Sequence, residues 1–74
     1  MPVIDMEKTG TNIKNYMKML GYSVSDIQKI LGLAGTQAIY HWLNGMCVPK
    51  LDNLVILANI FGVTVDDLLV VDIV

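Results

Sequence analysis

Arginine is missing from this chain, and most residues with specialised chemistry are scarce. A single cysteine, Cys47, excludes an internal disulfide, and with a single histidine, His41, it cannot supply the four ligands of a structural zinc site. No serine, cysteine or carboxylate is placed to act with the histidine, and nothing beside the cysteine would stabilise a thiolate. We therefore expect no enzyme, no metal site and no cofactor.

Long apolar runs are also missing, although 54% of the residues are hydrophobic. The longest run, Leu54 to Ala58, is far shorter than the roughly 18 residues that suggest a membrane span. The first residues lack the charged-then-apolar order of a signal peptide. The 74 residues therefore predict one cytoplasmic domain, with a core over about residues 11–69 and a short extension at each end.

Charge is unevenly distributed along the chain, whose net charge is −2. Residues 1–50 hold all five lysines and three acidic residues, a net charge of +2, whereas residues 51–74 hold four aspartates and no base, a net charge of −4. The overall balance argues against nucleic acid as a partner, because phosphate contacts normally need a basic patch. Because the lysines and most of the aspartates lie in different parts of the chain, this argument against nucleic acid is weakened. Lys14 and Lys18, four residues apart, are expected to face solvent.

Apolar residues at helical spacing predict five short helices, and hence an all-α bundle. Ser23 with Asp26 and Thr64 with Asp67 have the spacing of capping boxes. The β-branched tail, residues 70–74, is expected to be extended. The five apolar stripes are Ile13, Tyr16, Met17 and Leu20; Val24, Ile27, Ile30 and Leu31; Ile39, Trp42 and Leu43; Leu51, Leu54, Val55, Ala58 and Phe61; and Val65, Leu68 and Leu69.

The informative unit is residues 23–45, in which two short helices flank a tight turn that contains glycine, the pattern of a helix-turn-helix. In DNA-binding versions the second helix enters the major groove. Here its outward positions are polar: Gln37 can pair with adenine, and Tyr40, His41 and Asn44 can reach base edges or phosphates. Thr36, a plausible N-cap, and the free N–H groups after it can hold a phosphate. Trp42 is expected in the core.

Three segments together resemble the Cro/lambda-repressor (XRE-type) helix-turn-helix family over about residues 11–69. They are Ser23–Gly32, the run Ile39-x-x-Trp42-x-x-Gly45 with Pro49 four residues later, and the ending Phe61-Gly62-Val63-x-x-Asp66-x-Leu68. The resemblance implies a five-helix lambda-repressor-like bundle and a dimeric transcriptional regulator that binds double-stranded DNA. Because no sensor domain is attached, we expect no small-molecule ligand.

Departures from the family pattern fall where such domains often contact phosphate. Val24 stands where a glutamine is common, and Gln28 stands where a small alanine usually packs. The turn before Ile39 is one residue longer than usual, and the loop after Gly45 lacks its usual basic residues. We expect Gln28, Lys29 and Lys50 to lie near phosphates instead.

Two alternatives remain open from the sequence. The apolar surplus of residues 51–61 and of the tail belongs either to a packed monomer core or to a homodimer interface, and the dimer is favoured because large exposed apolar patches are uncommon on monomers. The fold is interpreted first as a sequence-specific DNA-binding regulator on a near-palindromic operator. The alternative is a protein–protein interaction module without DNA binding.

Overall fold

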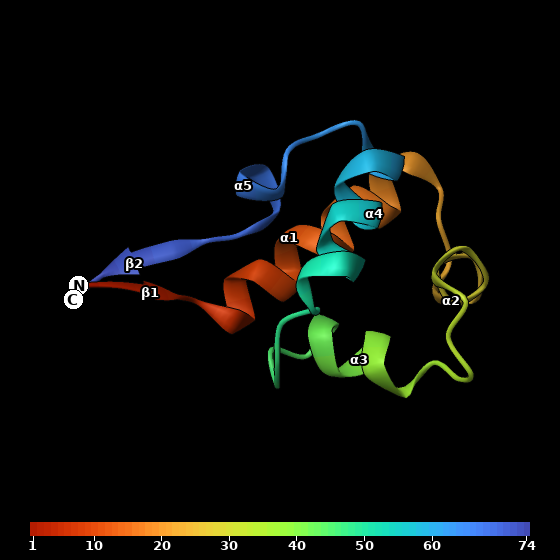
Figure 1. The fold of residues 1–74 in the computed structure, drawn as a ribbon, viewed down its shortest axis with the longest axis horizontal. Helices are drawn as coiled ribbons and strands as arrows, with labels where there is room; N and C mark the ends of the chain where they lie inside the picture. The colour runs from red at the N-terminus through yellow and green to blue at the C-terminus, as the bar shows by residue number, and fades with distance from the viewer.

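The computed structural model describes residues 1–74 and contains five helices and one small two-stranded sheet (Figure 1). Helices α1, α4 and α5 lie together, and α2 and α3 lie against one side of them. The predicted all-α class is therefore correct. The elements are β1 (Pro2–Ile4), α1 (Met6–Leu20), α2 (Val24–Leu31), α3 (Gln37–Leu43), α4 (Leu51–Phe61), α5 (Val65–Leu68) and β2 (Val71–Ile73).

Helix α1 begins well before its apolar stripe. Asp5 is its N-cap and accepts a hydrogen bond at 2.8 Å from the backbone N–H of Lys8. The early turns bury small residues instead of large ones, because α1 passes very close to the end of α3. A Cβ on Gly10 would collide with the Trp42 carbonyl oxygen and would lie 3.1 Å from that of Leu43. Glycine at this position therefore sets the spacing between α1 and α3.

Both predicted capping boxes are present. The Ser23 hydroxyl accepts from the Asp26 N–H at 3.0 Å, and the Asp26 carboxylate accepts from the Ser23 N–H at 2.9 Å. Thr64 and Asp67 make the same reciprocal pair at the start of α5. Each box satisfies two backbone donors that a helix start leaves without partners, so both helices begin where the sequence predicts.

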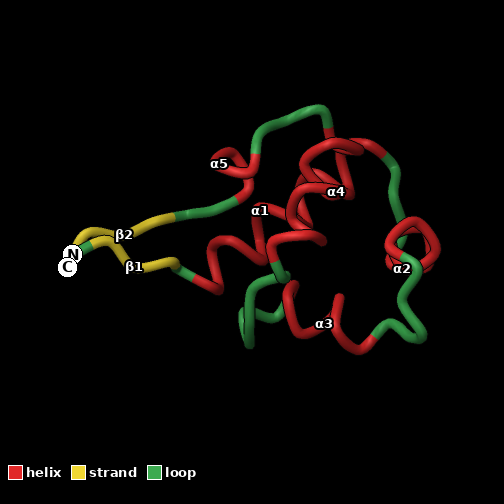
Figure 2. Tube along the Cα trace, viewed as in Figure 1, coloured by secondary structure: helices red, strands yellow, loops and turns green.

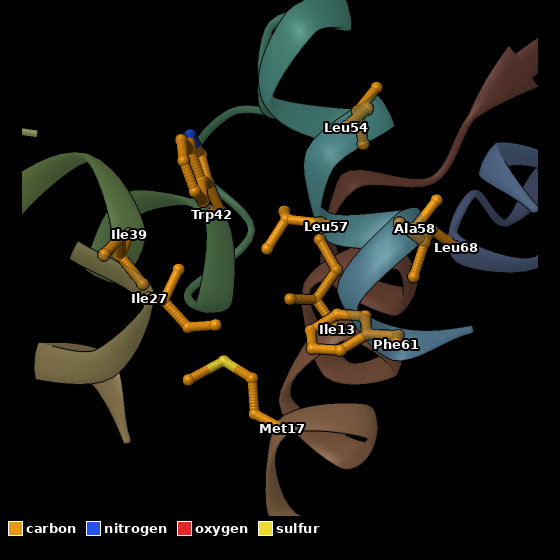
Figure 3. Packing of buried hydrophobic residues seen from close by; sticks show 10 residues of the cluster. All are labelled: Ile13, Met17, Ile27, Ile39, Trp42, Leu54, Leu57, Ala58, Phe61 and Leu68. Atoms are coloured by element: carbon orange, nitrogen blue, oxygen red, sulfur yellow. The ribbon is translucent and has the colours of Figure 1, made fainter. Parts of the chain in front are cut away.

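The core gathers apolar side chains from all five helices (Figure 3). The expectation for α4 was partly wrong. Leu57, assigned to no buried stripe, is fully buried, whereas Leu51 is 71% exposed and Val55 is 52% exposed. Since α4 is apolar nearly all round, its periodicity does not determine which face turns inward. The buried residues are Ile13, Met17, Ile27, Ile39, Trp42, Leu54, Leu57, Ala58, Phe61 and Leu68.

The two ends of the chain form an antiparallel ribbon that projects from the helices (Figure 2). Val3 is paired with Asp72, and the predicted extended tail thus includes strand β2. Side chains of α1 hold the segment before β2. The Thr9 hydroxyl accepts from the Val70 N–H at 3.0 Å, and the Asn12 amide donates to the end of α5. The sequence did not predict β1.

None of the five helices has the length and apolar character that a membrane span requires.

Candidate nucleic-acid interface

Helix α3 is oriented by the two side chains that it buries. Ile39 is 0% exposed and Trp42 is 4% exposed, and both belong to the core, as expected for Trp42. Burial of this face leaves the opposite face of α3 in solvent. That exposed face carries the polar residues expected to read DNA, namely Gln37, Tyr40, His41 and Asn44.

The exposed residues of α3 follow one another at helical spacing. Gln37 and His41 stand at positions i and i+4 of α3, and Asn44, the residue that ends the helix, continues this row at i+7, with Tyr40 beside it. Gly35 leaves room for the first of these side chains, because a Cβ there would collide with Oε1 of Gln37. The row offers amide, imidazole and phenol groups, which can donate and accept hydrogen bonds to base edges.

Thr36 ends the turn between the two helices, whereas Gln28 belongs to α2, and the two residues have different surroundings. Thr36 is the residue before α3 and is half-buried, but its side chain makes no capping hydrogen bond. Gln28 is half-buried on α2, and its amide donates to the Leu33 carbonyl at 3.2 Å. This bond holds the turn after α2. A phosphate contact by Gln28 would need this amide to share its hydrogen bonds or to move.

Lys29 and Lys50 are exposed but stand apart from the row on α3. Lys29 lines a separate shallow hollow with Asp26, Ile30 and Leu20, at the junction of α1 and α2. Lys50 is the residue before α4 and makes no side-chain cap. The structure therefore does not gather the three predicted phosphate contacts into one cluster with the reading face.

A hollow beside α3 is lined by Lys14 and Lys18, two lysines that the sequence analysis expected only to face solvent. It encloses about 370 Å³ between α1, the start of α2 and α3. Lys14 and Lys18 project from α1, and Tyr40 and Asn44 line the hollow from α3. The only signal for them in the sequence was their spacing of four residues on one face of a helix. Their closeness to α3 depends on how α1 and α3 pack, which the local pattern does not encode.

The carboxylate of Asp26, bonded to Ser23 at the edge of this hollow, caps the start of α2. The backbone N–H and then the hydroxyl of Ser23 hold the pKa of Asp26 below its usual value, and the positive charge of Lys29 adds to this effect. Asp26 therefore remains ionised at neutral pH and balances part of the charge of Lys29. Lys14 and Lys18 have no carboxylate among the residues that share their hollow.

No cluster of three or more His, Cys, Asp or Glu side chains is present that could hold a metal ion. Cys47 is a free, exposed thiol in the loop between α3 and α4. His41 is exposed on α3. The chemistry concentrated on this side of the molecule is hydrogen bonding and positive charge, which serve binding.

Two helices joined by a turn, with the second displaying polar side chains, define the class of helix-turn-helix domains. The family model for helix-turn-helix domains of the XRE type matches residues 13–68, and the chain belongs to this family. It is a family of DNA-binding regulators and is not typically enzymatic. Comparisons with curated proteins and with solved structures give no significant match.

Proposed function

We propose that this domain is a sequence-specific transcriptional regulator that inserts α3 into the major groove of a near-palindromic operator. The observation that carries the proposal is the row of exposed polar residues on α3, fixed in orientation by buried Ile39 and Trp42. A helix of this kind reads bases through the edges that the major groove displays. Such a regulator acts in the cytoplasm, where its DNA is found.

Each residue of the row has a role suited to its chemistry. Gln37, at the start of α3, can pair bidentately with adenine N6 and N7. Tyr40, His41 and Asn44 reach adjacent base edges or the phosphates that border them. Thr36, whose hydroxyl does not cap α3, is free to donate to a phosphate. Phosphate contacts by Gln28, Lys29 and Lys50 remain predictions.

Apolar surface that the monomer leaves uncovered supports the proposal of a homodimer. Leu51, Val55 and Ile56 are exposed together on α4, and Val71 and Ile73 are exposed on β2. The apolar surplus seen in the sequence is therefore not absorbed into the monomer core. Two copies related by a two-fold axis would place their α3 helices about 34 Å apart, the spacing of successive major grooves.

The test is selection from a random duplex pool, followed by fluorescence anisotropy on the enriched sequence. We expect an enriched near-palindrome, and Gln37→Ala should reduce discrimination at one base pair in each half-site by about 1–3 kcal/mol. Asn59→Ala is the matched control, because it removes an exposed amide from α4.

Two outcomes would overturn the proposal. If Gln37→Ala and Asn59→Ala leave base preference equally unchanged, α3 is not the reading helix. If the wild-type chain binds no duplex even at low salt, the acidic, arginine-free surface identifies a protein–protein interaction module instead.

A further inference from the structure

The hollow beside α3 combines an open cavity, two lysines and a border with the exposed face of α3. Lys14 and Lys18 stand one helical turn apart on α1 and line the same side of it. The opposite side is formed by Tyr40 and Asn44 of α3, and Ser23 lies at its edge. Side chains that can donate hydrogen bonds thus surround one open cavity.

The two lysines supply positive charge to the cavity, and the carboxylate bonded to its edge, that of Asp26, is held by the backbone N–H of Ser23. The residues lining the cavity include no aspartate and no glutamate. By contrast, Lys8 and Lys29 each lie near an acidic side chain, since their charges help to lower the pKa of Asp5 and of Asp26. In a chain with net charge −2, the hollow is therefore a place of locally unbalanced positive charge. Because screening acts over about 8 Å at physiological salt, this local charge matters more than the overall balance.

The position of the hollow beside α3 indicates that its ligand is the backbone of the DNA strand next to this helix. Tyr40 and Asn44 belong both to the hollow and to the exposed face of α3. A helix that occupies a major groove about 12 Å wide is bordered by the phosphates of the strands that form its edges. A DNA strand bordering α3 on this side would run directly over Lys14 and Lys18.

We propose that the hollow between α1, α2 and α3 is the main phosphate-binding site of the domain, with Lys14 and Lys18 contacting the backbone of double-stranded DNA. This inference rests on the proposed function and adds to it two residues and a site. The lysine ammonium groups bind phosphate oxygens as point charges, so they supply affinity without sequence preference. The site accounts for how an acidic chain without arginine holds DNA.

The test is the salt dependence of binding to the selected operator and to a random duplex. Each lysine–phosphate contact contributes about 0.9 to the slope of log affinity against log salt. The double variant Lys14→Gln, Lys18→Gln should therefore lower the slope by about 1.8. Between 50 and 200 mM salt it should lose about tenfold less affinity than the wild type does. Operator and random duplex should be affected equally.

The control is Lys8→Gln, which removes a lysine charge from outside the hollow, beside Asp5 at the start of α1. We expect its slope to stay close to that of the wild type. The variant Lys14→Arg, Lys18→Arg should retain the wild-type slope, and circular dichroism should show that all three variants are folded.

The proposal is overturned if the wild type binds the operator but the hollow variant leaves the slope unchanged, or if Lys8→Gln lowers the slope by as much for each lysine removed. The proposed function would survive either result, because the operator would still be bound. Absence of wild-type binding at low salt would reject both proposals together.

Discussion

The two parts of this domain differ in the chemistry of the surface that they expose. The part that contains α1, α2 and α3 carries all five lysines and exposes polar residues on α3. The part from Leu51 onward carries four aspartates and no base, and it exposes aliphatic side chains on α4 and β2. One surface is suited to phosphates and base edges, and the other to an apolar contact. The overall charge of −2 is the sum of the charges of both parts, so it does not reveal the difference between them.

The largest effect should come from the core that joins the two parts. Leu57 is fully buried on α4, whereas its neighbour Ile56 is 38% exposed. Leu57→Ala should cost about 2–5 kcal/mol of unfolding free energy, because it removes packed atoms and leaves a cavity. Urea denaturation of Leu57→Ala beside Ile56→Ala measures the difference. Equal losses for the two variants would mean that α4 buries a different face.

A smaller loss is expected where α1 meets α3. Gly10→Ala places a Cβ against the backbone carbonyl of Trp42, which cannot move as a flexible side chain would. Overpacking of this kind costs about 1–3 kcal/mol. Thr11→Ala is the control, since Thr11 is exposed. Stability of Gly10→Ala equal to that of the control would show that the two helices are further apart.

The proposed dimer distinguishes the apolar surfaces of the two parts, because it uses only the surface of α4 and β2. Val55→Lys places a charge within the exposed patch of α4 and should weaken self-association at least tenfold, or about 1.4 kcal/mol. Met19→Lys alters an exposed apolar residue of α1 and should leave association unchanged. Sedimentation equilibrium measures both. Dissociation caused by Met19→Lys alone would place the interface on the other part of the domain.

The smallest effect concerns pH and compares the capping boxes of the two parts. Hydrogen bonds from Ser23 and Thr64 lower the pKa of Asp26 and of Asp67. A carboxylate with a lowered pKa stabilises the fold above the unfolded value of about 3.8, and this contribution is lost as pH falls through the folded value. Asp26→Asn and Asp67→Asn should each make stability depend less on pH below about 4.

The measurement for these variants is urea denaturation at pH 7 and at pH 3. Asn59→Ala, at an exposed position on α4 that carries no carboxylate, is the control and should keep the wild-type pH dependence. A pH dependence that is unchanged in both capping variants would mean that neither box remains formed in solution.

Local patterns predicted the parts of the fold that local interactions determine. The capping boxes at Ser23 and Thr64 and the buried stripe of α3 follow from short-range spacing, and the structure contains them. The first turns of α1 were missed because they bury Thr9 and Gly10, which form no apolar stripe. Their burial is dictated by α3 and by the segment before β2, which are distant in sequence.

The candidate site likewise has one part that the sequence predicts and another part that it does not. The exposed row on α3 could be predicted because Ile39 and Trp42 identify the buried side of the helix. The hollow could not, because it depends on the packing of α1 against α3. A lysine pair four residues apart on a helix is usually only a solvated face. What distinguishes Lys14 from other surface lysines is its neighbour Tyr40, 26 positions later in the sequence.

The ribbon of β1 and β2 has a consequence for the dynamics of the domain. It joins the segments most distant in sequence, so its formation closes the longest loop of the chain, yet all six of its residues are exposed. Two-stranded ribbons are marginally stable on their own in water. Hydrogen exchange at Val3 and Asp72 should therefore be fast while the amides of α3 stay protected. We therefore expect the ribbon to open and close without disturbing α3.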